Sequence, residues 1–337
     1  MTATKRDNKN ASQIIAEALN LEMQRDENVV ILGEDVGRMG GVFGATRQLQ
    51  KKYGDRRVRD MPISEMSFAG MGVGMAMAGL RPVIEIMFVD FIGVCLEQIY
   101  NAMAKNHYMS GGTARVPMVI KTAGGNIGDA AQHSQCLWGT FAHLPGMYVV
   151  APSSMHDYKG MLAAAIETDN PVVFIEHKRL LMTKGADRMF DPPIPDGRFV
   201  VPLGKAQVVR QGRDLTLVTL SATVDDALVA AEELAAEKID VEVIDLRSVV
   251  PLDIETITES VAKTNRLLVV DEDYLSFGLS GEIVAQVCEA LSPSEVHQVA
   301  RHAVPDVPIP AALSLEKVVV PSAESIRQKI QEMSRHG

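Results

Sequence analysis

The 337-residue sequence has few cysteines, no excess of positive charge and no long apolar run. Its three cysteines, Cys95, Cys136 and Cys288, are odd in number, widely spaced and without a CxxC pair, which argues against a disulfide framework or a zinc cluster. The longest uncharged, mostly apolar run, residues 68–80, is too short to span a bilayer. The 33 Lys and Arg against 43 Asp and Glu give a net charge of −10, so we expect neither nucleic acid nor a membrane surface as a partner.

The composition is that of an ordinary globular protein, with 47% hydrophobic and 23% charged residues. Since a domain has about 150 residues, the length predicts two domains. The first residues, MTATKRDNKN, contain no apolar stretch, so we expect no signal peptide and a cytoplasmic location.

The first half of the chain alternates short, β-rich apolar runs with segments of helical length. A sheet whose strands are apolar on both faces and are separated by helices is a parallel sheet covered on both sides. The pattern therefore predicts the α/β class with a doubly wound sheet. The expected strands lie at 29–32, 82–88, 116–121, 147–150 and 172–176, and the expected helices at about 12–25, 64–79, 90–106 and 154–167.

The pattern stops between about 186 and 204, where four prolines predict a stiff linker. It then restarts, with expected strands at 215–220, 241–246, 267–271 and 296–300 and expected helices at 224–237, 279–291 and 322–333. We therefore expect an α/β domain over 1–185, a Pro-rich linker over 186–204 and a second, smaller α/β domain over 205–337.

Gly70, Gly72 and Gly74 lie within one of the expected helices. They do not fit the GxGxxG fingerprint of dinucleotide-binding folds, and no Walker A loop occurs in the chain. Because glycine in a helix costs about 1 kcal/mol relative to alanine, close packing must offset the loss. That packing is either against a neighbouring helix of the same domain or across an oligomer interface.

Three acids stand beside or within apolar segments: Glu34, Glu65 and Glu85. Glu65 opens an expected helix, so it either interacts with the helix dipole or is a buried functional acid. His133 lies between a glycine-rich stretch and an apolar helix, a place suited to proton transfer, although a structural histidine is an equal alternative. His143 could share the same cavity.

A series of motifs in fixed order runs through nearly the whole chain. They stand at residues 33–36 (GEDV), 51–55 (KKYGD), 62–66 (PISEM), 68–70 (FAG), 78–82 (AGLRP), 108–112 (YMSGG), 131–135 (AQHSQ), 145–146 (PG), 170–173 (NPVV), 270–272 (VDE) and 305–310 (PDVPIP). Together they closely resemble the β subunit of the thiamine-diphosphate-dependent first component of 2-oxo acid and acetoin dehydrogenase complexes. The resemblance implies a pyrimidine-binding domain followed by a transketolase-like C-terminal domain.

The resemblance also implies roles for individual residues. Glu65 matches the glutamate that binds the aminopyrimidine ring nitrogen and promotes the imino tautomer, which removes the thiazolium proton. His133 matches the active-site histidine that shuttles protons and helps to orient the substrate or the lipoyl group. The remaining cofactor-binding positions are Phe91, which stacks on the aminopyrimidine, Ile63 and Met87, which line that ring, and Glu34, an acid of the adjoining polar network.

Enzymes of this kind hold the diphosphate and its magnesium with a Gly-Asp-Gly motif followed by Asn, and this chain has no such motif. We therefore expect no metal site here, and an α subunit that holds Mg²⁺ and the diphosphate. The family's assembly is a heterotetramer of two α and two β chains with a lipoyl acyltransferase core at the β C-terminal domain. A potassium site is not predicted, because Thr168 stands where some relatives carry Asp and only Asn170 matches.

The substrate of the resembling enzymes is a small molecule. Residues 126–133 and 176–178 look more like the acetoin-cleaving members than the pyruvate or branched-chain ones. Three alternatives stay open: a pyruvate-type substrate, the C-terminal subunit of a split transketolase, or a non-catalytic interaction subunit.

Overall fold

The fold is taken from a computed structural model that describes residues 8–335. Most of the N-terminal segment on which the expectation of no signal peptide rests, residues 1–7, lies outside the described residues. Over residues 8–335, none of the helices has the length and apolar character needed to cross a membrane. The cytoplasmic location stays a prediction.

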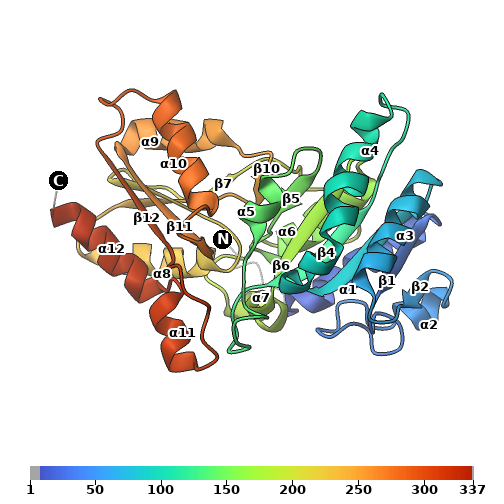
Figure 1. The fold of residues 1–337 in the computed structure, drawn as a ribbon. Coiled ribbons are helices and arrows are strands. Elements are labelled where there is room, and N and C mark those ends of the chain that lie inside the picture. The colour runs from blue at the N-terminus through green and yellow to red at the C-terminus, as the bar shows by residue number, and fades with distance from the viewer. Residues whose placement is uncertain (1–7, 336–337) are drawn as a thin grey trace.

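The first sheet has seven strands in the order β10-β5-β6-β4-β3-β1-β2. All neighbours are parallel except β10, which comes from the C-terminal half and pairs antiparallel with β5. Figure 1 draws β10 beside β5, where the two halves of the molecule meet. The strands are β1 (Val29–Gly33), β2 (Val58–Asp60), β3 (Arg81–Phe88), β4 (Val119–Gly124), β5 (Tyr148–Val150), β6 (Val172–His177) and β10 (Ser248–Val250).

The second sheet has five strands in the order β12-β11-β8-β9-β7, parallel except for the edge pair of β7 and β9. Its strands are β7 (Gln207–Arg210), β8 (Leu215–Thr219), β9 (Val241–Asp245), β11 (Arg266–Tyr274) and β12 (Gln298–Val304). The predicted class, two mostly parallel α/β sheets, is confirmed. The sequence pattern missed the short or edge strands β2, β7 and β10, and it placed β4 three residues too early.

Helices cover both faces of the sheets (Figure 1). The helices of the N-terminal half are α1 (Ala11–Arg25), α2 (Leu49–Tyr53), α3 (Glu65–Met77), the 3₁₀ helix η1 (Val89–Cys95), the π-helical stretch η2 (Gln98–Met103), α4 (Ala104–Met109), α5 (Trp138–Ala142), α6 (Met155–Glu167), α7 (Lys178–Met182) and the 3₁₀ turn η3 (Gly185–Asp187). Those of the C-terminal half are α8 (Thr223–Ala236), α9 (Ile254–Thr264), α10 (Leu279–Ala290), α11 (Leu313–Val319) and α12 (Ala323–Arg335).

Three large apolar cores fill the layers between sheets and helices. One packs α1, α6 and α7 on one face of the first sheet, and another packs α8 and α12 on the second sheet. The third begins under α3 on the opposite face of the first sheet and continues through α5 into α9 and α10. Because this core is shared by both halves, the halves are joined by buried apolar contact as well as by the chain. In the described chain, residues 188–206 form neither helix nor strand, and the expected domain boundaries stay predictions.

The glycines of α3 permit close packing inside the same half of the chain. A Cβ atom added to Gly72 would lie 2.8 Å from the Ile84 side chain, and one added to Gly70 would lie 3.2 Å from Gln98. Gly74 has nothing within 4 Å of its would-be Cβ atom. Packing within the domain therefore accounts for Gly72 and Gly70, and Gly74 is left without a structural reason in this chain.

We expect alanine to have opposite effects at two of these positions. Gly74→Ala should stabilise the isolated chain by up to about 1 kcal/mol, because alanine favours the helix and meets open space. Gly72→Ala should destabilise it, because overpacking against Ile84 costs about 1–3 kcal/mol. The favourable effect of alanine on the helix, about 1 kcal/mol, offsets only part of this cost. Unfolding midpoints of the two variants would check this, and shifts of the same sign would contradict the packing argument.

Candidate functional site at the carboxyl edge of the first sheet

The candidate residues lie along one edge of the first sheet. Glu65 follows β2, Glu34 follows β1, Phe91 follows β3 and His133 follows β4, and these four strands are consecutive neighbours in the sheet. Parallel strands end at the same edge, and open α/β sheets bind ligands outside these carboxyl ends. Neighbouring strands are about 4.8 Å apart, so β2 and β4 are separated by about 15 Å, the scale of an elongated ligand.

The two acids at one end of this edge are electrostatic neighbours. The backbone N–H of Met61 donates to the carbonyl of Gly33 at 2.9 Å, which ties the loop after β2 to the end of β1. Glu34 is half-buried, and its Oε1 atom is buried without a hydrogen-bond partner among the described residues. Burial, the charge of Glu65 and that of Asp35 raise the pKa of Glu34. A ligand that offers N–H donors here would satisfy this oxygen.

Glu65 is the first residue of α3, where the helix dipole stabilises a negative charge. The residue is also partly exposed at the carboxyl edge of the sheet. Both roles considered from the sequence are therefore open to it.

Ile63 and Met87 lie on either side of β1. Ile63 is 88% exposed in the loop before α3. Met87 is partly buried and occupies a bulge in β3, because Ile86 pairs with Thr122 whereas Phe88 pairs with Ala123. A bulge re-aims the side chains around it, and such bulges are common beside active sites.

An aromatic cluster surrounds His133. Its ring centroid lies 5.0 Å from that of Phe88 and 5.5 Å from that of Phe91, and the two phenylalanines are 5.4 Å apart, all edge to face. Sequence reasoning named Phe91 and His133 but missed Phe88. The only available signal was its position at the end of an expected strand.

The hydrogen bonds of His133 define its tautomer. Nδ1 lies 3.0 Å from the backbone carbonyl of Asp129, and since a carbonyl only accepts, Nδ1 carries a proton. In the neutral ring Nε2 is then the basic nitrogen, and among residues 8–335 it has no hydrogen-bond partner. His133 thus differs from a structural histidine that is hydrogen-bonded at both ring nitrogens.

Lys178 is a second residue that sequence reasoning did not place in the site. Its side chain is fully buried, and Nζ donates to Asp129 Oδ2 at 3.0 Å and to the backbone carbonyl of His133. The ammonium lies 5.3 Å from the centre of the Phe88 ring. Lys178 therefore connects the segment that bears His133 to the aromatic cluster.

The third acid singled out from the sequence, Glu85, has a structural explanation. Lys121 forms ion pairs with Glu85 at 2.8 Å and with Glu176 at 2.9 Å, all three on neighbouring strands and buried. Burial lowers the pKa of Lys121, but the two carboxylates outweigh it and raise that pKa. Burial raises the pKa of Glu176 to about 7, against the effect of Lys121. Two acids share one cation, so Glu85 is no free catalytic acid.

A further buried cluster joins the two halves behind the His133 segment. His177 Nε2 lies 2.9 Å from Glu272 Oε2, and Nδ1 of the same ring accepts from the backbone N–H of Arg179. Nε2 therefore donates to Glu272. Burial would raise the pKa of Glu272, yet His177 and Arg179 lower it. The thiol of Cys136 lies within 4.8 Å of these ligand atoms, and burial raises its pKa well above the ordinary value.

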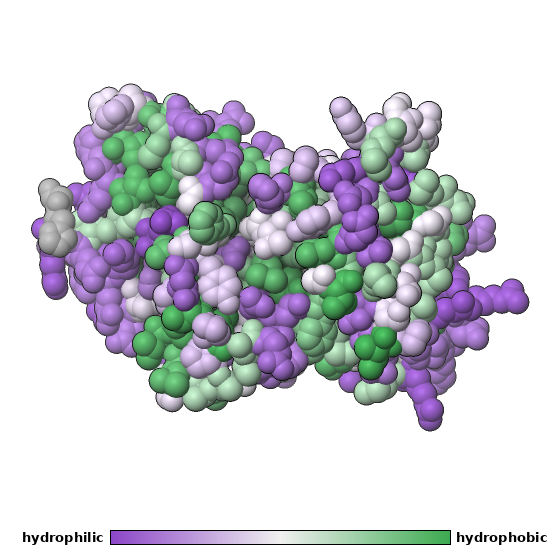
Figure 2. All heavy atoms as spheres, in the orientation of Figure 1, coloured by the Kyte–Doolittle hydropathy of each residue, from purple (hydrophilic) through white to green (hydrophobic). Residues whose placement is uncertain are grey.

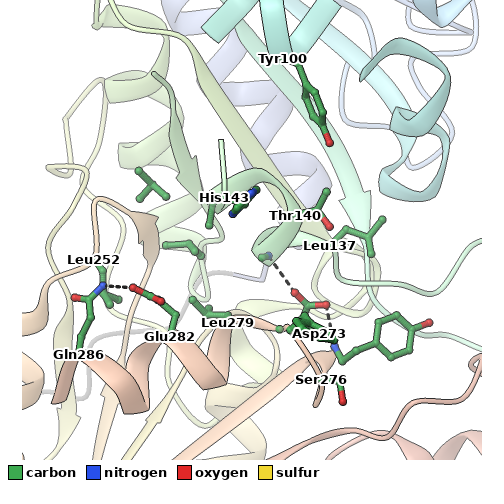
Figure 3. A pocket seen from close by; sticks show the side chains of 17 residues that line it. Tyr100, Leu137, Thr140, His143, Leu252, Asp273, Ser276, Leu279, Glu282 and Gln286 are labelled. Atoms are coloured by element: carbon green, nitrogen blue, oxygen red, sulfur yellow. Dashed lines mark hydrogen bonds between the residues drawn. The ribbon is translucent and has the colours of Figure 1, made fainter. Parts of the chain in front are cut away.

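His143 does not share a site with His133. It lines a separate cleft of about 890 Å³ between the halves, together with Tyr100, Asp273 and Glu282. Figure 3 shows Glu282 hydrogen-bonded to Gln286, and Asp273 bonded to the backbone N–H of residue 139 beside it. His133 is not among the residues that line this cleft, so the structure does not support a cavity shared by the two histidines.

Models of two protein families match the chain: transketolase, pyrimidine binding domain, over residues 7–184, and transketolase, C-terminal domain, over residues 204–326. The β subunit of acetoin:2,6-dichlorophenolindophenol oxidoreductase from Cupriavidus necator is 40% identical over 334 residues, covering 96% of each chain. The β subunit of the human mitochondrial pyruvate dehydrogenase E1 component is 41% identical over 314 residues, covering 93% of this chain and 87% of that one.

The chain belongs to the family of β subunits of acetoin and pyruvate dehydrogenases. This family is thiamine-diphosphate dependent, and the resemblance inferred from the motifs is confirmed. A solved split-gene transketolase, an inactive β4 tetramer, has a TM-score of 0.78 at 23% identity and covers 96% of this chain and 98% of its own. At that identity it supports the transketolase-like fold alone.

The buried ion pairs of the β subunit predict a pH-dependent stability. The pKa of Glu176 is about 7 in the folded chain against 4.5 ordinarily, so the folded state keeps a proton that the unfolded state loses in this range. The group's contribution to stability is full below about pH 4.5 and is lost as the pH rises through about 7. Glutamine cannot ionise, so the stability of Glu176→Gln relative to the parent chain should rise by about 2 kcal/mol between about pH 5.5 and about pH 8.

Unfolding midpoints of parent and variant at both pH values would measure this gain. Glu167→Gln is the matched control, because Arg198 lowers the pKa of Glu167 and the carboxylate is ionised in both states over this range. Equal differences at the two pH values for Glu176→Gln would contradict the assignment.

Proposed function

We propose that this chain is the catalytic β subunit of a thiamine-diphosphate-dependent dehydrogenase, the first component of a complex, which cleaves acetoin or decarboxylates a 2-oxo acid. The observation that carries the proposal is the order of residues along the sheet edge: two acids, an aromatic cluster and a histidine with a free basic nitrogen. The boundaries 1–185, 186–204 and 205–337 for the two domains and their linker are part of it.

The residues at this edge fit the aminopyrimidine of thiamine diphosphate. Glu34 has a buried, unpartnered oxygen that calls for an N–H donor, and Glu65 is the neighbouring acid. Phe91 offers a ring face for stacking, and Ile63 and Met87 offer apolar contacts beside it. When bound, the cofactor supplies an electron sink for the cleaved carbon–carbon bond.

The site residues of this chain would then have separate roles. Glu65 would hold the pyrimidine ring nitrogen through its carboxylate and so favour one tautomer of the bound ring. His133 accepts or returns a proton at Nε2 on the substrate side. The rings of Phe88 and Phe91 pack edge to face against the imidazole of His133, which is partly buried, and shield part of it from water.

The other half of the site is proposed to come from an α subunit, which holds the diphosphate and Mg²⁺. The absence of a Gly-Asp-Gly motif from the sequence supports this, as do exposed apolar residues around the edge: Met39, Ile63 and Met66 are 64%, 88% and 55% exposed. Two α and two β chains would form the assembly.

A lipoyl acyltransferase core is proposed to bind the C-terminal half and to receive the acyl group. Apolar side chains are exposed on α11, where Leu313, Leu315 and Val318 are 58%, 57% and 82% accessible. Green atoms gather in Figure 2 at the place where Figure 1 draws this helix. A surface of this kind suits a protein partner.

Acetoin is the preferred substrate, on the resemblance of residues 126–133 and 176–178 to acetoin-cleaving members. Pyruvate is the second candidate, because pyruvate dehydrogenase β subunits match equally well, with 44% identity over 310 residues for the Arabidopsis thaliana protein. The exact substrate depends in part on the α chain, which lines the remainder of the pocket.

The proposal predicts that the isolated chain has no measurable affinity for thiamine diphosphate and no turnover, because Mg²⁺ and phosphate ligands are missing. The complex with its α subunit should bind the cofactor and reduce 2,6-dichlorophenolindophenol with acetoin, pyruvate or a branched-chain 2-oxo acid. Calorimetry and dye reduction would measure both.

Three results would overturn the proposal. Tight, Mg²⁺-dependent binding by the isolated chain would contradict the shared site. Transfer between a ketose phosphate and an aldose phosphate, without dye reduction, would identify a split transketolase. A complex that binds no cofactor would identify a non-catalytic interaction subunit.

Glu65→Gln tests the role of the acid within the complex. Glutamine keeps the size but cannot share the proton, so turnover should fall by about 10²–10⁴-fold, as is typical of lost acid–base catalysis, while the thermal midpoint falls no further than the loss of a helix-dipole interaction requires. If Glu65 only interacts with the helix dipole, the variant should lose about 0.3–1 kcal/mol of stability and keep its full turnover. Glu255→Gln, in the first turn of α9, is the matched control for that dipole effect.

A further inference from the structure

The segment that bears His133 is a tight turn with an unfavourable backbone. Gly128 has φ +87° and Ala130 has φ +67°, and for alanine this left-handed conformation costs about 1–2 kcal/mol. The backbone N–H of His133 closes the turn onto the carbonyl of Ala130 at 3.2 Å. A turn that carries such strain keeps its shape only when neighbouring groups hold it.

Lys178 holds both ends of this turn. One bond runs from Nζ to the carboxylate of Asp129 at the start of the turn, and the other runs to the carbonyl of His133 at its end. The carbonyl of Asp129 in turn accepts from Nδ1 of the His133 ring. One ammonium group therefore fixes the backbone on both sides of the imidazole and the group that sets its tautomer.

Burial decides what Lys178 can do. Its side chain has no exposed surface, whereas Asp129 is 38% exposed. The ammonium group interacts with the carboxylate of Asp129, the carbonyl of His133 and the ring of Phe88. It is therefore not accessible to a bound substrate. Its influence on chemistry must therefore pass through His133.

The C-terminal half supports the same arrangement. Lys178 begins α7 directly after His177, whose ring is fixed by Glu272 of β11. Glu316 of α11 accepts from the backbone N–H of Gly128 at 2.9 Å, just before the turn. Two buried carboxylates from the other half thus hold the flanks of the turn: Glu272 binds the residue before Lys178, and Glu316 binds Gly128, the last glycine before the turn.

We infer that Lys178 is the positioning residue for His133: its two hydrogen bonds to the 129–133 turn hold the imidazole at the angle and tautomer needed for proton transfer. The inference rests on the proposed function of His133. Without the ammonium the turn relaxes, and a displacement of about 1 Å costs on the order of 10²-fold in rate.

The chain offers a closely matched control in Lys159. Its side chain is 3% exposed, and its Nζ binds the carboxylate of Glu17 at 2.7 Å and the carbonyl of Pro195 at 3.1 Å, 5.8 Å from the Phe199 ring. Lys178→Met and Lys159→Met therefore remove the same set of interactions, a carboxylate, a carbonyl and a ring, at two places. Only the first lies against the His133 turn.

The first measurement needs no cofactor and uses the full chain alone. Amide hydrogen exchange should rise by tenfold or more over residues 128–136 in Lys178→Met and stay at the parent level there in Lys159→Met. Equal protection of the turn in parent and Lys178→Met would overturn the inference. If Lys178→Met does not fold, Lys178→Gln, which can still donate to one acceptor, should give an intermediate effect, and parent-like protection in it would overturn the inference as well.

The second measurement is a double-mutant cycle in the complex with the α subunit. Lys178→Met should lower turnover by roughly 10–100-fold in the parent background. It should have no further effect in the His133→Ala background, because a residue that acts through another loses its effect when that other is absent. Equal losses in both backgrounds, or the same loss in Lys159→Met, would assign Lys178 to stability alone.

The two proposals fail in different ways. If the parent complex has no turnover, or if His133→Ala keeps full turnover at an unchanged midpoint, the proposed function is at fault. If His133→Ala is impaired and Lys178→Met is not, only the positioning role is wrong.

Discussion

Parallel pairing of β2, β1, β3, β4 and β6 is the constraint on which the site depends. Every loop that follows these strands emerges at one edge, so residues about 100 positions apart, such as Glu34 and His133, come to one line of the sheet. Apart from β2 and the Glu85–Lys121–Glu176 cluster, the strands are apolar on both faces and are covered by helices on both sides, so most polar side chains lie at the carboxyl edge.

The C-terminal half adds a strand to the first sheet and holds the segments that carry the site residues. It supplies β10 as an edge strand, shares one continuous apolar core, and places two buried carboxylates against the segments that carry Lys178 and His133. Buried acids of this kind are costly unless they are paired, so their partners in the N-terminal half fix how the halves dock. The geometry of the site is therefore a property of the whole chain.

Much of this was predictable from the sequence, for reasons that differ by feature. Long strands such as β3 and β6 and helices such as α1 and α6 were predictable, because the pattern of apolar residues in each segment determines its secondary structure. Short strands such as β2 and β10 form because a neighbour offers hydrogen bonds, and no local pattern marks them. Glu34, Glu65, Phe91 and His133 were found through motifs, and the structure collects them at one edge. Phe88 and Lys178 were missed because their roles arise from contacts across β3, β4 and β6.

Glu34 has a buried carboxylate oxygen that no donor among the described residues satisfies. A buried carboxylate oxygen without a donor costs about 1–3 kcal/mol, and the like charge of Glu65 adds to that cost. Glu85 shows that this fold can pair a buried acid, since Lys121 lies beside it on the next strand. No such cation accompanies Glu34 among the described residues, although the same sheet could have supplied one. The difference between the two acids is therefore one of charge: Lys121 forms an ion pair with Glu85, whereas the carboxylate of Glu34 has a like charge beside it and would be stabilised by any donor that binds there.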